Sequence, residues 1–145
     1  MVSIMIAQSA QAALRAELDA SDHRLTFYDG DKVAHVYKVR LGLGGIGKCK
    51  AGDKRTPLGT YTLRPAKKSD QFRWFLPVGY PNAQDQANGC TGSDIGLHGT
   101  GRLLRRRMAQ GAGIDWTLGC MAVTNKDIDQ IRDLVRSPIQ LTIKR

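Results

Sequence analysis

Short apolar runs separated by glycines and prolines constrain the fold of this chain more than any other feature. Within each run the apolar side chains recur at every second position, which is typical of strands with one buried face. Most of the 16 glycines and 5 prolines lie between these runs, and this favours a turn-rich β protein over a helical bundle. We expect strands near residues 14–18, 25–27, 33–41, 60–63, 94–97 and 139–143. The second and third runs flank an Asp-Gly-Asp turn and predict a β-hairpin.

One segment, residues 124–136, carries a full helix pattern. Thr124 is a suitable N-cap and Asp127 falls in the first turn, where its charge favours the helix dipole. The apolar stripe consists of Ile128, Ile131, Leu134 and Val135. Pro138 then prevents the helix from continuing. With 145 residues, we predict a single, mainly β domain, a curved sandwich or barrel with one main helix packed on it.

The connecting segments give weaker signals. Residues 67–70 and 77–92 predict loops, and residues 101–113 predict one helical turn or two. Most of the aromatic mass is concentrated in Phe72, Trp74, Phe75 and the neighbouring Leu76. A sugar or peptide groove would use such residues, but we favour burial in the core.

Residues 42–49 nearly match a phosphate-binding loop, since GLGGIGKC follows a strand. Cys49 replaces the hydroxyl that would hold magnesium in such a loop. Pro57 and the glycines around it exclude the helix whose N-terminus would bind the phosphate. We therefore interpret residues 42–49 as a bend between strands and expect no nucleotide site.

The chain carries 22 Lys and Arg against 13 Asp and Glu, a formal charge of +9. This charge would attract anionic polymers such as nucleic acid, acidic lipid surfaces or bacterial wall polymers. A charge that serves only solubility explains the excess equally well. No run of residues approaches the ~18 apolar positions of a transmembrane helix.

Three cysteines leave two arrangements open. In an exported protein an odd number suggests one disulfide and one free thiol, and a bridge between Cys49 and Cys90 would leave Cys120 free. We favour two unpaired cysteines at 49 and 90, because the sequence does not show that these positions lie close together.

His98 and Cys120 are the candidate catalytic residues. His98 ends a predicted strand, and Cys120 follows Gly119 shortly before the predicted helix. A thiol beside an imidazole suits nucleophilic acyl chemistry, because the imidazole takes the thiol proton and later returns it to the leaving group. An isolated cysteine is usually a small buried apolar residue, but the context of this pair favours a nucleophile.

That context consists of short motifs in a fixed order around the pair. They are residues 98–99 (HG), 117–120 (TLGC) and 125–127 (NKD), preceded by residues 52–61 (GDKRTPLGTY) and by residues 80–82 (YPN) followed by Asp85. In these motifs the sequence resembles the L,D-transpeptidase catalytic domain, the YkuD family of bacterial cell-wall enzymes. The resemblance covers residues 25–143, which is most of the chain.

The resemblance implies a thioester on Cys120 formed with a peptidoglycan stem peptide and then passed to an amine acceptor or to water. No metal or organic cofactor is needed for this chemistry. We expect the Gly99 carbonyl to hold the His98 ring, and the backbone N–H groups of Gly119 and Cys120 to form an oxyanion hole. We assign substrate binding to Thr117, Trp116, Arg102 and Asn125.

The peptidoglycan substrate that the resemblance implies also suggests where in the cell the protein acts. Residues 1–12 include a short apolar stretch and a small-x-small site, but no preceding basic residue. They are either the remnant of an export signal or a ragged N-terminus, and we favour the remnant. Residues 13–145 would then form the catalytic domain of a periplasmic or otherwise exported protein that binds no nucleic acid. The sequence does not predict an oligomeric state.

The chain departs from the family pattern at two positions. Ala122 stands where most members have Arg, and Leu118 stands where many have His. A missing guanidinium removes a substrate or ordering contact, so a hydrolytic peptidoglycan amidase or carboxypeptidase stays open. A non-catalytic wall-binding module is a further alternative. A zinc hydrolase that uses His98, Cys120 and Cys90 fits less well, because the spacing matches no usual zinc site.

Overall fold

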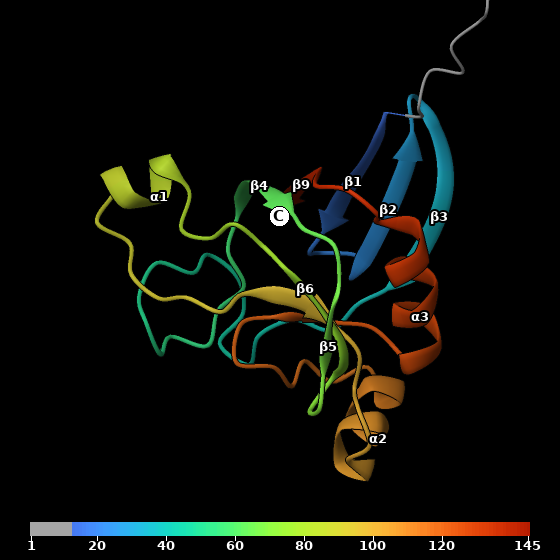
Figure 1. Cartoon of the computed structure of the whole chain (residues 1–145). Helices are drawn as coiled ribbons and strands as arrows, with labels where there is room; N and C mark the ends of the chain where they lie inside the picture. The colour runs from blue at the N-terminus through green and yellow to red at the C-terminus, as the bar shows by residue number, and fades with distance from the viewer. Residues whose placement is uncertain (1–12) are drawn as a thin grey trace, which may run out of the picture.

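The computed structural model describes residues 13–145, in which two β-sheets are flanked by short helices (Figure 1). The first sheet has the order β3 (Lys32–Lys38), β2 (Arg24–Asp29), β1 (Leu14–Asp19), β9 (Ile139–Lys144) and β4 (Gly59–Leu63). The second has the order β5 (Lys67–Ser69), β6 (Arg73–Pro77), β7 (Gly96–His98) and β8 (Met121–Ala122). The helices are α1 (Ala83–Ala87), α2 (Leu104–Ala112) and α3 (Asn125–Leu134). The predicted mainly β fold is confirmed, whereas the prediction for residues 1–12 lies outside the described residues.

The alternating runs form the first sheet because each buries one face. In β1, Ala16 and Leu18 are buried and lie opposite Phe27 and Leu25 of the antiparallel β2. On its other side β1 pairs in parallel with β9, where Leu141 is buried. Burial of such a side chain contributes about 1.5–3 kcal/mol. The predicted hairpin is confirmed as β2 and β3, which pair antiparallel.

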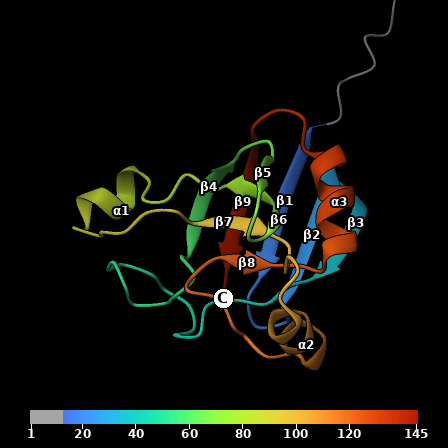
Figure 2. The same cartoon turned by 60° about the horizontal axis from the view of Figure 1, so that its bottom comes forward.

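The second sheet brings together the two segments that carry the candidate site. Strand β7 lies between β6, its antiparallel neighbour, and β8, its parallel neighbour. His98 lies opposite Phe75 on one side and Ala122 on the other. Figure 2 shows these short strands in front of the longer strands of the first sheet. Segments distant in sequence therefore meet at the ends of β7 and β8.

Helix α3 confirms the main helix prediction and its N-cap. The side chain of Thr124 accepts a hydrogen bond from the N–H of Asp127, while Ile128 and Ile131 are fully buried and the helix packs against β6. The helix ends at Leu134, two residues before the predicted end, because Val135 leaves helical geometry ahead of Pro138. Within residues 13–145 no helix is long and apolar enough to span a bilayer.

Three elements differ from the sequence predictions. Residues 67–69, predicted as a loop, form the edge strand β5, whose lysines and serine carry no apolar signal and which depends on pairing with β6. Residues 77–92, predicted as loop, contain α1, whose Asn82 and Asp85 form a capping box. Residues 101–113, predicted to form one helical turn or two, do contain a helix, α2, which at nine residues is slightly longer than predicted and ends at Gly113 in the left-handed conformation.

Cys49 and Cys90 form a disulfide, so our preference for two unpaired cysteines was wrong. A backbone hydrogen bond joins the two segments, since the N–H of Thr91 donates to the carbonyl of Cys49 at 2.8 Å. This contact is between residues some 40 positions apart, and no local pattern predicts it. The bridge fastens the loop after β3 to the segment after α1, and Cys120 is the free cysteine.

We predict that the double substitution Cys49→Ser/Cys90→Ser lowers the free energy of unfolding by about 2–4 kcal/mol, because the bridge closes a long loop in the unfolded chain. Urea unfolding under non-reducing conditions measures the change, and the reduced parent chain should show the same loss. The control is Cys120→Ser, which leaves the bridge intact. Equal stability of the double variant and the parent would contradict the predicted role of the bridge.

Candidate active site

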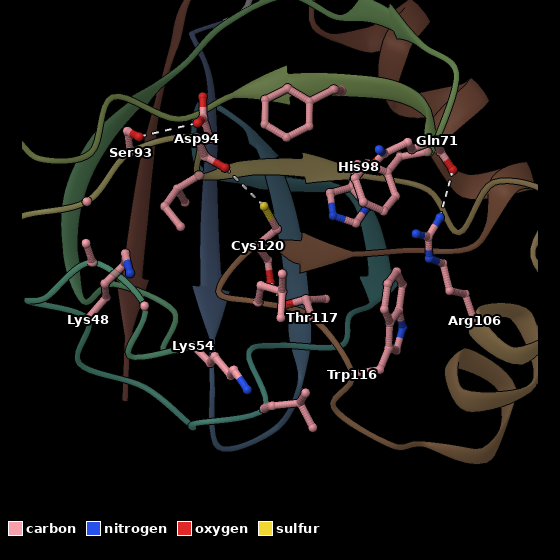
Figure 3. A pocket seen from close by; sticks show the side chains of 18 of the residues that line it. Lys48, Lys54, Gln71, Ser93, Asp94, His98, Arg106, Trp116, Thr117 and Cys120 are labelled. Carbon is pink, nitrogen blue, oxygen red and sulfur yellow. Dashed lines mark hydrogen bonds between the residues drawn. The ribbon is translucent and has the colours of Figure 1, made fainter.

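Cys120 and His98 open into one cavity of about 1010 Å³. His98 ends β7 and Cys120 directly precedes β8. In the parallel pair, Leu97 lies opposite Met121 and His98 opposite Ala122, so residues 98 and 120 share one face of the sheet. Figure 3 shows that both the thiol and the imidazole line this cavity.

The His98 ring is held in one tautomer. Its Nδ1 lies 2.6 Å from the Gly99 carbonyl oxygen, and a carbonyl only accepts, so Nδ1 carries the proton. Burial lowers the pKa of His98 to about 4, and the nearby positive charge of Arg106 acts in the same direction while the Gly99 hydrogen bond opposes it. At neutral pH the ring is therefore uncharged, with an unprotonated Nε2 able to accept a proton.

Aromatic rings fix the plane of this imidazole. Phe72 stacks on His98 with ring centroids 3.8 Å apart, Phe75 stacks at 6.1 Å, and Trp116 lies tilted at 5.8 Å. We predicted that Phe72 and Phe75 are core residues, but both are half-buried and line the cavity. The burial prediction was wrong for these two because the period of a strand does not say which face meets the core and which meets a pocket.

Cys120 is half-buried, and its thiol donates to the carbonyl of Asp94 at 3.4 Å. Burial raises the pKa of Cys120 above its ordinary value. The resting site therefore holds a neutral thiol beside a neutral imidazole rather than an ion pair. Asp94 has φ 59°, a left-handed conformation that is uncommon for a non-glycine residue and often marks functional sites.

Thr117 clamps the turn that presents the nucleophile. Its buried hydroxyl donates to the Cys120 carbonyl at 2.6 Å and accepts the N–H of Gly119 at 3.1 Å. Because both functions of the hydroxyl are committed, this geometry gives Thr117 a positioning role and does not support its predicted substrate contact. The same hydrogen bond occupies the Gly119 N–H, so the predicted oxyanion donor at Gly119 is not supported either. The Cys120 N–H remains the predicted donor.

Gly119 is nevertheless required by the turn. Its φ is 132°, and a Cβ at this position would lie 2.8 Å from the carbonyl oxygen of Arg55. A side chain would therefore displace the neighbouring loop and, with it, Cys120. The glycine that precedes the nucleophile acts through this close approach of two backbones.

Asn125 holds the turn that follows His98. Its Oδ1 accepts the N–H groups of Thr100 and Gly101 at 3.1 and 3.0 Å, and its Nδ2 donates to the Gly101 carbonyl at 2.9 Å. The amide is therefore committed to backbone, and this geometry does not support the predicted substrate contact. Arg102 lies with Asn125 on a second, smaller cavity, so the predicted substrate role of Arg102 is not supported for the catalytic cavity.

Arg106, four residues further on, lines the catalytic cavity instead. Its guanidinium carbon lies 4.7 Å from the Phe72 ring centroid and 5.9 Å from that of Trp116. The indole N–H of Trp116 donates to Gln110 Oε1 at 2.9 Å. Trp116 itself lines the cavity, and its substrate contact stays a prediction. The sequence did not separate Arg106 from its neighbours, because four arginines follow Gly101 within six positions.

The loop after β3 forms the opposite wall and is organised by one carboxylate. Asp53 accepts the N–H groups of Cys49, Lys50 and Arg55 at 2.9–3.0 Å and the buried ammonium of Lys48 at 2.9 Å. Partial burial alone would raise the pKa of Asp53, but these hydrogen bonds lower it far below its usual range. The aspartate of the 52–61 motif therefore holds the loop in shape rather than meeting substrate.

The positions that depart from the family pattern are also explained by their surroundings. Ala122 is fully buried and exchanges two backbone hydrogen bonds of 2.8 Å with Arg40, so an arginine side chain has no space there. Leu118 is 72% exposed at the cavity rim. The zinc alternative loses one ligand, since the sulfur of Cys90 is bonded to Cys49. Within residues 13–145 no three His, Cys, Asp or Glu side chains gather as a metal site.

Comparisons with known proteins agree with this architecture. The YkuD family model, the L,D-transpeptidase catalytic domain, matches residues 14–140. Over 102 residues the chain is 30% identical to YafK of Escherichia coli K12, whose name places it among the L,D-transpeptidases. That match covers 68% of this chain and 36% of YafK.

Two solved structures show the same fold at lower identity. The helical cell shape determining protein Pgp2 from Campylobacter jejuni has a TM-score of 0.71 at 22% identity, covering 92% of this chain and 48% of Pgp2. L,D-transpeptidase 3 from Mycobacterium tuberculosis, in complex with a faropenem-derived adduct, has a TM-score of 0.63 at 12% identity, covering 92% and 61%. The chain thus spans about a third of YafK and half of Pgp2.

We predict that alkylation of Cys120 by iodoacetamide accelerates steadily with pH and has no plateau between about pH 5 and 7. Only the thiolate reacts, and burial raises the pKa of the Cys120 thiol above its ordinary value. The rate is measured by intact mass, which reports Cys120 alone because the other two cysteines are bridged. A pH-independent rate in the acid range would instead reveal a thiolate–imidazolium pair and contradict the neutral resting state.

Proposed function

The chain belongs to the YkuD family of L,D-transpeptidase catalytic domains, and we propose that it is an acyltransferase that forms a thioester between Cys120 and a peptidoglycan stem peptide. One observation carries the proposal. A free thiol and a neutral imidazole with an unprotonated Nε2 open into the same cavity. This is the minimum equipment for acyl transfer through a cysteine.

The chemistry begins with proton transfer from the thiol. Cys120 turns from the Asp94 carbonyl toward Nε2 of His98, which takes the proton as the sulfur attacks the carbonyl carbon that precedes a terminal D-residue. The Cys120 N–H stabilises the negative oxygen of the tetrahedral intermediate. As the C–N bond breaks, His98 returns its proton to the leaving amine. The acyl group then remains on sulfur as a thioester.

The raised thiol pKa determines how this site is activated. Because the resting thiol is protonated, His98 acts as a general base during attack and not as a partner in a preformed ion pair. The Gly99 carbonyl supports this step, since it accepts from Nδ1 and stabilises the imidazolium that forms. A base with a pKa of about 4 is unprotonated throughout the neutral range.

The thioester has two possible fates, transfer to an amine or transfer to water. Transfer to an amine gives a cross-link or an anchored chain and makes the protein an L,D-transpeptidase, which is our proposal. Transfer to water would make it a peptidoglycan amidase or carboxypeptidase of the same fold. Both share the acyl-enzyme, so the reacting residues are the same. A non-catalytic wall-binding module is the remaining alternative, favoured only by the charge of +9.

A stem-peptide substrate also implies a location. We propose that the protein acts in the periplasm or elsewhere in the bacterial cell envelope, in cell-wall biogenesis and thereby in cell shape. Its charge of +9 supports attraction to anionic wall polymers. Its partners are then stem peptides and an amine acceptor. No metal or organic cofactor takes part in the proposed steps.

We predict that Cys120→Ala abolishes turnover of stem peptides and that His98→Asn lowers kcat/KM by about 10²–10⁴-fold. In the parent, kcat/KM should stay level across neutral pH and fall only as the pH drops through about 4, because protonation of Nε2 then removes the base. His35→Asn, a change in an exposed histidine on β3, is the control. Undiminished turnover by Cys120→Ala would end the proposal.

We predict that mass analysis of muropeptide products shows adducts of an added amine acceptor in amounts that rise with its concentration. Amine and water compete for the same thioester, so the ratio of adduct to hydrolysed product reports the partition directly. Exposure to faropenem provides an independent trap and should add one adduct mass to the parent but none to Cys120→Ala. Hydrolysed product alone at every acceptor concentration would assign the hydrolase instead.

A further inference from the structure

We propose that Arg106 is a specificity-determining residue that binds the carboxylate of the leaving residue during thioester formation and the carboxylate beside the attacking amine during transfer. This inference rests on the proposed acyl-transfer function and deepens it. It names the residue that recognises the free carboxylate of the donor already proposed, and it requires a carboxylate beside the amine of the acceptor.

The charges of the catalytic cavity are unbalanced. Its lining contains four basic side chains and one carboxylate, namely Lys48, Lys54, Arg105, Arg106 and Asp94. Figure 3 shows Lys48 and Lys54 on one side of Cys120, and Arg106 on the other side beyond His98. Such a cavity favours ligands with negative groups.

Among the cations of the cavity, Arg106 has the position best fixed relative to His98. Its guanidinium and the His98 ring share two aromatic neighbours, Phe72 and Trp116. One N–H of the group donates to the Gln71 carbonyl at 3.1 Å, which fixes its orientation. Since a guanidinium has five N–H donors, enough remain for a bidentate pair with a carboxylate.

The other three cations suit this role less well. The ammonium of Lys48 is already bound to Asp53 at 2.9 Å and to the Lys50 carbonyl at 3.0 Å. Lys54 is exposed and lies below Cys120 in Figure 3, away from His98. Arg105 is exposed, so water weakens any ion pair that it forms.

The order of bond changes places the leaving residue at the Arg106 end. The sulfur of Cys120 bonds to the acyl carbon and the C–N bond breaks, while the thiol proton passes through Nε2 of His98 to the leaving nitrogen. That nitrogen must therefore lie within hydrogen-bond reach of His98. In a C-terminal residue the carboxylate is only two bonds from this nitrogen, so it falls on the His98 side of the nucleophile, where Arg106 lies.

The same geometry selects the acceptor. Transfer is the reverse of thioester formation with a new amine, so the attacking nitrogen takes the place of the leaving nitrogen and gives its proton to His98. A carboxylate next to that amine is then placed to bind the guanidinium of Arg106. Amines that carry an adjacent carboxylate should therefore be better acceptors than simple amines of the same size.

The test compares a stem tetrapeptide ending in free D-alanine with the same peptide ending in D-alaninamide. The parent chain should favour the acid by at least about tenfold in kcat/KM, as expected for a charge-assisted pair. Arg106→Ala should lose most of this preference because kcat/KM for the acid falls. Its kcat/KM for the amide should stay within about threefold of the parent value. Arg106→Lys should restore part of it, because the charge remains without the paired donors.

Arg107→Ala is the matched control, since Arg107 is the next residue on α2, is exposed and does not line the cavity. It should keep the full preference, and thermal unfolding should show that both alanine variants are folded. An equal loss on acid and amide, or an unchanged preference in Arg106→Ala, would overturn the assignment while leaving the acyl-transfer function intact. No turnover of either peptide by the parent would overturn the proposed function, and this assignment with it.

Discussion

The hydrogen bond from Nδ1 of His98 to the Gly99 carbonyl is the interaction on which the rest of the site depends. It fixes the tautomer, and this tautomer leaves Nε2 without a proton and therefore able to accept one from the nucleophile. A buried, uncharged ring stacked on Phe72 has little freedom to tilt or to change partner. A carbonyl from the adjacent residue therefore does what a carboxylate does in other catalytic triads.

The remaining structure keeps this histidine opposite the nucleophile. Parallel pairing of β7 with β8 places residues 98 and 120 on one face, and two polar side chains hold the backbone on either side. Asn125 binds the turn after His98, and Thr117 binds the turn that contains Cys120. These residues hold the backbone in place, and they thereby keep the imidazole and the thiol from adopting other positions. Across the cavity, Asp53 and the disulfide fix the facing loop in the same way.

The sequence predicted the parts of this architecture that depend on local pattern. Alternation located most strands, a Thr124 cap located α3, and two short motifs singled out His98 and Cys120. Tertiary contacts decided the rest. The Cys49–Cys90 bridge joins residues far apart in the chain, and the choice between Arg102 and Arg106 depends on where α2 begins and which way it faces. A motif that contains a hydroxyl or an amide also does not show whether that group hydrogen-bonds to backbone or to substrate, as Thr117 and Asn125 illustrate.

The most direct test of the central claim is the ¹⁵N NMR spectrum of the His98 ring as a function of pH, which distinguishes protonated from unprotonated ring nitrogens. Our account predicts a protonated Nδ1 and an unprotonated Nε2 at pH 7, with titration only as the pH falls through about 4. A ring that is doubly protonated at neutral pH, or one that carries its single proton on Nε2, would contradict the account.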